Sequence, residues 1–159
     1  MKKQIGCLAL GVLICGSAAA QSIMQPGGWE MKVRITAENP MTGESKKANE
    51  SVSRMCLTKE YLSTDPYLTP KVDKEQMEQK SAKCDISDEK RTANAASWRM
   101  QCTMIDGSSV DMTISNTASA RKLDSKIRQV IKRGSNSGIV NITLTSSRIG
   151  QCTKEMLTL

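Results

Sequence analysis

The segment CDISDEKRTANAASWRMQC, residues 84–102, contains the features that determine the fold. Its polar stretch from Lys90 to Ala95 predicts a bend, and a chain that folds back around Ala93 places Cys84 opposite Cys102. Beyond the bend, apolar side chains recur at every second position, at Trp98, Met100, Cys102 and Met104. This is the period of a β-strand with one buried face. The segment therefore predicts an antiparallel hairpin with a cross-strand disulfide.

Other stretches alternate in the same way. The clearest is WEMKVRITAE, residues 29–38, and residues 48–55 are predicted to return antiparallel to it. Residues 110–115 and 139–145 predict two later strands, and Thr58 is expected to cap a short helix. The fold class predicted is mainly β: a curved antiparallel sheet or a partly open barrel with one or two short helices, stapled by disulfides.

Residues 118–133 are ambiguous. Leu123, Ile127, Val130 and Ile131 have the spacing of one face of an α-helix. The stretch from Lys126 to Lys132 could instead join the sheet. The local spacing favours the helix.

The first twenty residues have the pattern of a cleaved export signal. Lys2 and Lys3 precede the apolar run IGCLALGVLIC, residues 5–15, and small residues precede Gln21. The run is too short to span a bilayer, which takes about 20 apolar residues. We therefore expect cleavage between Ala20 and Gln21, a periplasmic protein and no transmembrane anchor.

Cleavage would leave one basic domain. Removing 20 of the 159 residues leaves 139, enough for a single domain over residues 21–159. Residues 1–20 contain two lysines and no acid, so the formal net charge falls from +7 to +5, which favours anionic partners. The bulky Ile14 before Cys15 is unlike a lipid-attachment site, so a lipoprotein is not expected.

Four cysteines remain after cleavage: Cys56, Cys84, Cys102 and Cys152. An even number in an exported chain indicates two disulfides, although the count allows three pairings. The hairpin favours Cys84 with Cys102, and by elimination Cys56 pairs with Cys152. We expect this longer link to join the last strand to an early one and to close the sheet on itself. The chain contains no Cys-x-x-Cys motif and no histidine, so neither a metal nor a cofactor is expected.

Several short motifs occur in an order that resembles a known family. They are PGGWEMKV (26–33), Met55-Cys56-Leu57-Thr58, Lys83-Cys84, Trp98-x-Met100-x-Cys102 and Arg148-Ile149-Gly150-x-Cys152. Together they resemble the domain of unknown function 3617, found in small exported bacterial proteins. The resemblance implies a mostly antiparallel β domain of the cell envelope with structural cysteines, and it implies no reaction, ligand or catalytic residue. The chain departs from that family at Gly28, where a bulky residue is common, and over 121–133, where a Gly-rich strand is implied.

The residue types give little support to catalysis. Without histidine, the chain lacks the usual general base at neutral pH. Asp85, Asp88 and Glu89 cluster near the hairpin bend, which is typical of a solvated turn. No catalytic residue is proposed, and the protein is not expected to be an enzyme.

Six cations occur within residues 121–133 against the single acid Asp124: Arg121, Lys122, Lys126, Arg128, Lys132 and Arg133. On a helix with its apolar stripe inward, they would form a surface able to meet the phosphates of anionic lipid or lipopolysaccharide. The simpler interpretation is the solvated face of a packed helix. Nucleic acid is not expected as a partner, because no aromatic residue interleaves the cations.

Trp29 and Trp98 also have two interpretations. They could line a cavity for an apolar ligand, or, more simply, they belong to the core. Two functions remain open. One is a non-catalytic envelope binding module whose curved sheet and basic rim hold an amphiphilic or anionic partner; the other is a structural or inhibitory protein that acts by contact with another envelope protein, as periplasmic lysozyme inhibitors do.

Overall fold

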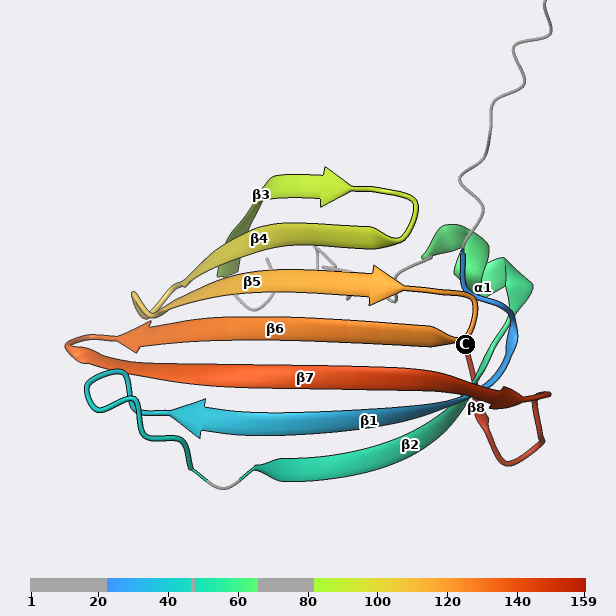
Figure 1. Cartoon of the computed structure of the whole chain (residues 1–159). Helices are drawn as coiled ribbons and strands as arrows, with labels where there is room; N and C mark the ends of the chain where they lie inside the picture. Colours follow the sequence, from blue (N-terminus) through green and yellow to red (C-terminus); the bar gives the residue numbers. More distant parts are fainter. Residues whose placement is uncertain (1–22, 47, 66–81) are drawn as a thin grey trace, which may run out of the picture.

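The strands lie side by side in one curved sheet (Figure 1). The computed structural model describes residues 23–46, 48–65 and 82–159. The described elements are β1 (Gly27–Glu38), β2 (Asn49–Leu57), α1 (Lys59–Thr64), β3 (Ala82–Arg91), β4 (Ala95–Met104), β5 (Ser109–Ala118), β6 (Lys122–Arg133), β7 (Asn136–Gly150) and β8 (Leu157–Thr158). The strand order is β3-β4-β5-β6-β7-β1-β2-β8, and every neighbouring pair is antiparallel except β2 with β8. The mainly β class is therefore confirmed.

The hairpin predicted from residues 84–102 is present as β3 and β4. Cys84 lies opposite Cys102 and Ile86 lies opposite Met100, and the two cysteines form a disulfide. The expected return of residues 48–55 is also confirmed, because β2 runs antiparallel to β1 with Trp29 opposite Met55.

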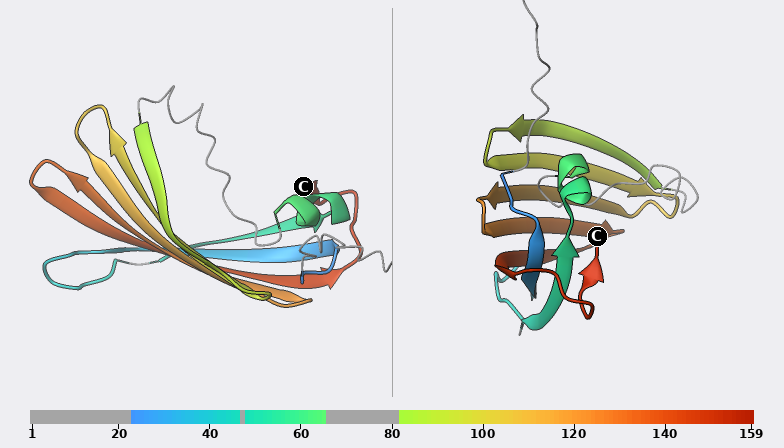
Figure 2. Two further views of the ribbon diagram at one scale, coloured as in Figure 1. Left: turned by 90° about the horizontal axis from the view of Figure 1, so that it is seen from above. Right: turned by 90° about the vertical axis from the view of Figure 1, so that its right-hand side faces the viewer.

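One face of the sheet contains the core. Figure 2 shows that the sheet bends and that α1 lies on the inner side of the bend. We call this side the concave face; its buried side chains include Trp29, Leu57, Trp98, Ile114 and Leu123. Leu62 of α1 packs against them, and α1 begins at the predicted cap, where the Thr58 hydroxyl accepts a hydrogen bond from the Tyr61 amide at 3.1 Å.

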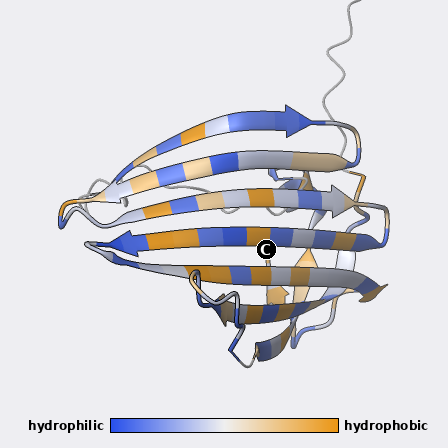
Figure 3. Ribbon diagram, turned by 60° about the vertical axis from the view of Figure 1, so that its left-hand side comes forward, coloured by the Kyte–Doolittle hydropathy of each residue, from blue (hydrophilic) through white to orange (hydrophobic). Residues whose placement is uncertain are grey.

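The opposite face of the sheet is mostly polar. Side chains alternate between the two faces of a strand, and hydrophobic and hydrophilic bands accordingly alternate along the strands in Figure 3. We call this outer side the convex face; it includes Glu30, Arg54, Arg99, Asp111 and Lys126.

The helix predicted within residues 118–133 is wrong, because Lys122–Arg133 forms β6. Leu123 and Ile127 are four residues apart, a separation that fits both a helix face and one face of a strand. Val130 distinguishes the two, since it lies on the convex face, opposite Asp111 of β5. β6 is hydrogen-bonded to β5 on one side and to β7 on the other, and these long-range pairings override the local spacing.

The strands of the described residues form an open sheet, so the expected closure of the sheet on itself is also wrong. Its two edges are β3 and β8, at opposite ends of the strand order. The disulfide Cys56–Cys152 is present, with a sequence separation of 96 residues. Since β7, β1 and β2 are consecutive in the sheet, the disulfide joins the tail after β7 to the nearby β2 rather than to a distant edge.

The C-terminal tail passes close to the start of β1. A Cβ atom on Gly28 would lie 2.7 Å from the carbonyl oxygen of Gln151, and one on Gly27 would collide with the carbonyl oxygen of Gly150. The tail then pairs with β2 through β8, and the Leu159 carbonyl accepts a hydrogen bond from the Thr58 hydroxyl at 3.0 Å. A bulky residue at position 28 would therefore not fit this path of the tail.

Removal of the long disulfide is expected to destabilise the protein more than removal of the short one. In the chain-entropy model, a disulfide that closes about 100 residues stabilises by ~4.7 kcal/mol and one that closes about 15 residues by ~3 kcal/mol; the separations here are 96 and 18 residues. Urea unfolding of Cys56→Ala with Cys152→Ala should therefore give a lower unfolding free energy than Cys84→Ala with Cys102→Ala. A lower unfolding free energy for the variant without Cys84–Cys102 would contradict the larger contribution of the long disulfide.

Substitution of Gly27 by alanine is expected to destabilise the protein by about 1–3 kcal/mol, because its φ of +136° is strained for a residue with a Cβ and the added atom collides with backbone. Gly138→Ala in β7 is the matched control, since nothing lies within 4 Å of the added Cβ. In thermal unfolding, Gly27→Ala should lower the midpoint temperature clearly, whereas Gly138→Ala should change it little. Equal losses would show that Gly27 is not constrained.

Candidate functional site

β6 places its even-numbered cations in one row along the convex face. We call this the basic row: Lys122, Lys126, Arg128 and Lys132. The other two cations of the predicted patch lie apart from it. Arg121 precedes β6, and the Nη2 atom of Arg133 lies 3.7 Å from Oδ2 of Asp106. The structure thus brings together four of the six predicted residues.

Most of the basic row lacks a neutralising acid. Lys122 forms an ion pair with Asp124, with 2.8 Å between Nζ and Oδ2. Within the described ranges, Lys126, Arg128 and Lys132 form no ion pair, and all three are exposed. Their cross-strand neighbours are neutral: Ser115 and Thr143 for Lys126, Thr113 and Asn141 for Arg128, and Ser109 and Ser137 for Lys132. These three side chains therefore present positive charge to solvent.

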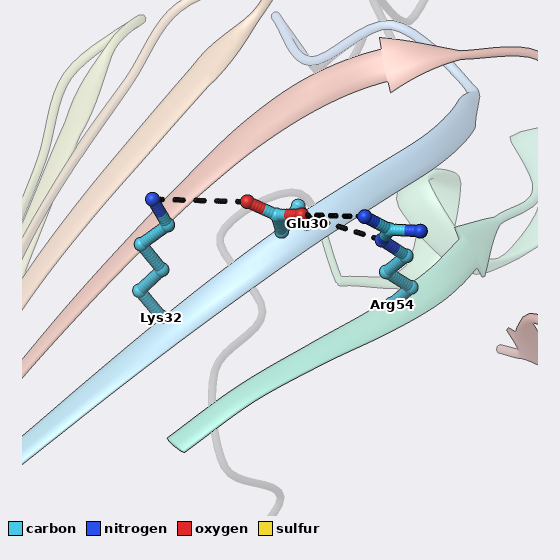
Figure 4. Close-up of polar contacts among 3 residues, drawn as sticks. All are labelled: Glu30, Lys32 and Arg54. Carbon is cyan, nitrogen blue, oxygen red and sulfur yellow. Dashed lines mark hydrogen bonds and ion pairs between the residues drawn. The ribbon is translucent and has the colours of Figure 1, made fainter. Parts of the chain in front are cut away.

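The convex face around β1 and β2 differs, because its cations are paired. Figure 4 shows Glu30 between Lys32 and Arg54. Lys32 Nζ is 3.8 Å from one carboxylate oxygen of Glu30, and Arg54 Nη2 is 3.2 Å from the other. The Nε atom of Arg34 lies 3.5 Å from Oε1 of Glu50. Within the described residues, the region of β1 and β2 therefore has no counterpart to the three cations of β6 that form no ion pair.

A hollow lies at one side of the basic row, beneath an irregularity of β3. The register of β3 against β4 shifts between Ser87 and Lys90. The hollow has a volume of about 440 Å³ and is lined by charged side chains of four strands: Asp88, Lys90, Arg99, Asp111 and Arg128. Hydroxyl groups of Ser97 and Thr113 and the apolar Val130 also line it. We call it the bulge hollow.

Within the bulge hollow, Arg99 and Asp111 bind each other. Arg99 Nε donates to Asp111 Oδ1 at 2.9 Å, its Nη2 donates to Oδ2, and Gln101 Nε2 also donates to Oδ2 at 3.3 Å. These hydrogen bonds, above all those from Arg99, hold the pKa of Asp111 below its usual range, against the opposing effect of burial. Asp111 is therefore a carboxylate at neutral pH, and its charge is already matched by Arg99.

The remaining predicted site residues take structural positions. Trp29 is fully buried and Trp98 is 7% exposed, and both belong to the core cluster. Trp98 also contributes to the lining of the bulge hollow. Among the described residues, no group of three or more histidine, cysteine, aspartate or glutamate side chains could hold a metal ion. No described helix has the length and apolar character needed to cross a membrane.

The sequence interpretation missed the bulge hollow. Alternation alone puts Arg99 opposite in face to Trp98 and Asp111 opposite in face to Met112, so it could have placed both on the polar face. Bringing Lys90 of β3 into one hollow with Arg128 of β6 requires the order of four strands and the irregularity of β3. Neither the strand order nor the irregularity can be predicted from the local spacing of apolar residues.

The comparisons with known proteins identify one family. The model of the family described as Protein of unknown function (DUF3617) matches residues 24–152. No curated protein and no solved structure matches the chain. The matched range runs from the buried Met24, just before β1, through the long disulfide at Cys152. The chain therefore belongs to the DUF3617 family.

Proposed function

We propose that the protein is an exported, non-catalytic binding module that holds a phosphate-bearing partner of the cell envelope on its convex face. The observation that carries the proposal is the exposure of Lys126, Arg128 and Lys132 in one row with no ion pair within the described ranges. Cations that form no ion pair with the described part of the chain are available to bind an external anion.

The sheet makes the basic row rigid. β6 pairs along its length with β5 and β7, so the backbone beneath the cations needs no ordering on binding. Residues two apart on a strand are separated by about 6.4–6.8 Å, which spreads the charges over an extended surface. Such a surface suits an array of phosphates, where each Lys or Arg near an anionic membrane contributes about 1 kcal/mol.

Two disulfides support the exported location, because disulfides persist in oxidising compartments such as the periplasm. The export signal expected in residues 1–20 lies outside the described residues. The proposal of a non-catalytic role rests on the chain's lack of histidine and on the engagement of Cys56, Cys84, Cys102 and Cys152 in disulfides.

The basic-rim form of the sequence hypothesis needs correction. The cations of the basic row do not surround the apolar concave face; they lie on the other side of the sheet from Leu123 and Ile127. A molecule with its apolar tail on the concave face could not also place its head group on the basic row. We therefore propose binding of anionic head groups through the convex face alone.

Replacement of Lys126, Arg128 and Lys132 by glutamine is expected to weaken binding to vesicles that contain phosphatidylglycerol by about two orders of magnitude, from about 1 kcal/mol per cation. Vesicle co-sedimentation measures the partition coefficient. Wild-type binding should also fall as salt is added, because exposed charges are screened, and it should be absent with phosphatidylcholine alone.

The matched control is the triple variant Lys46→Gln, Lys59→Gln and Lys154→Gln. It removes the same net charge from exposed positions that are outside the long strands, so it should lose much less binding than the β6 variant. Equal losses in the two variants would contradict a specific role of the basic row. Failure of the wild type to bind anionic vesicles would instead favour action by contact with another envelope protein.

A further inference from the structure

We infer that the bulge hollow is a binding site for a single phosphate group, with the Arg128 guanidinium and the Lys90 ammonium as its charged ligands. The inference deepens the proposed function and rests on it, since Arg128 belongs both to the basic row and to the bulge hollow. It adds selectivity: the row attracts anions by charge, whereas the hollow can recognise one group by its shape and hydrogen bonds.

The backbone of β3 builds the hollow. The register shift between Ser87 and Lys90 brings Asp88 and Lys90 to the lining. Asp88 has a φ of 56°, and no other non-glycine residue in the described ranges has a positive φ. β-bulges often re-aim side chains beside binding sites, and a strained residue persists where surrounding structure holds it in place.

The charges of the hollow leave an excess for an anion. Arg99 and Asp111 neutralise each other through their paired hydrogen bonds. Lys90 and Arg128 then face the single carboxylate Asp88. No ion pair within the described residues involves Lys90, Arg128 or Asp88. A net positive, partly enclosed site results.

The donor set and the size suit phosphate. The planar guanidinium of arginine matches phosphate by paired hydrogen bonds, and a lysine adds a point charge. The Ser97 and Thr113 hydroxyls line the same space and supply further donors. A volume of about 440 Å³ lies within the range of small-ligand sites and exceeds the needs of one phosphate group. The site therefore has room for the phosphate together with part of the group that carries it.

Titration of the ¹⁵N-labelled full-length mature protein with inorganic phosphate tests the inference by NMR. We expect saturable shifts confined to amides around the hollow, in particular those of Lys90, Ser97 and Thr113. Arg128→Gln should weaken phosphate binding about tenfold or more, as expected for loss of hydrogen bonds to a charged group. Lys126→Gln is the comparison variant, because it removes one charge from the same strand and face but does not line the hollow; it should weaken phosphate binding clearly less than Arg128→Gln does.

A second arm of the experiment uses vesicles that contain phosphatidic acid, and it distinguishes a lipid phosphate from a soluble one. Greater loss of vesicle binding in Arg128→Gln than in Lys126→Gln would support the site and identify its source as lipid. If phosphate shifts only the amides around the hollow and the protein binds no vesicles, the site would be supported, but the proposed binding to anionic head groups of the envelope would be contradicted. The inferred site would be overturned if Arg128→Gln and Lys126→Gln weakened phosphate binding equally, or if phosphate shifted amides over the whole convex face. Either result would still be consistent with anion binding by the basic row. Amide signals away from the substitution should match those of the wild type, which establishes that each variant is folded.

Discussion

Hydrogen bonding of β6 on both of its sides is the constraint on which the rest of the molecule depends. This pairing with β5 and β7 fixes the face that every side chain of residues 122–133 takes. Leu123 consequently lies in the core, 1% exposed, while Lys126 and Arg128 point to the convex face. A helix over the same residues would have put Val130 with Leu123 in the core. It would also have fanned the cations around a cylinder instead of aligning them.

The core that holds this sheet is small and has no phenylalanine. Trp29, Trp98, Leu57 and Leu123 supply much of the buried surface, together with methionines, whose flexible side chains fill gaps but specify one packing poorly. The disulfides offset this softness at both ends of the sheet. Cys84–Cys102 ties the edge strand β3 to β4, and Cys56–Cys152 holds the C-terminal tail against β2. The tail can take that path because Gly27 and Gly28 have no side chains to obstruct it.

The convex face has two regions that differ in whether their cations form ion pairs. Around Glu30, two cations share one carboxylate, and Arg34 pairs with Glu50, so each of these three cations has an acid partner. Along β6 the directly opposite cross-strand neighbours are hydroxyl and amide groups, and the cations remain exposed. The bulge of β3 then folds Asp88 and Lys90 over the edge of this surface. The basic row and the partly enclosed bulge hollow thus adjoin at Arg128, which belongs to both.

Local periodicity in the sequence determined the strands, because period-two alternation is a property of a single strand. It placed β1, β4 and β5, while the position of the predicted bend put Cys84 opposite Cys102 and the residue type of Thr58 indicated the helix cap. It could not assign residues 122–133, since Leu123 and Ile127 satisfy both the helical and the strand period. Only the tertiary structure decided that segment, because the deciding hydrogen bonds come from strands before and after it in the chain. The open edge of the sheet, the side on which the cations lie and the bulge hollow were decided in the same way, since each depends on how separate strands are ordered beside one another and not on any one of them alone.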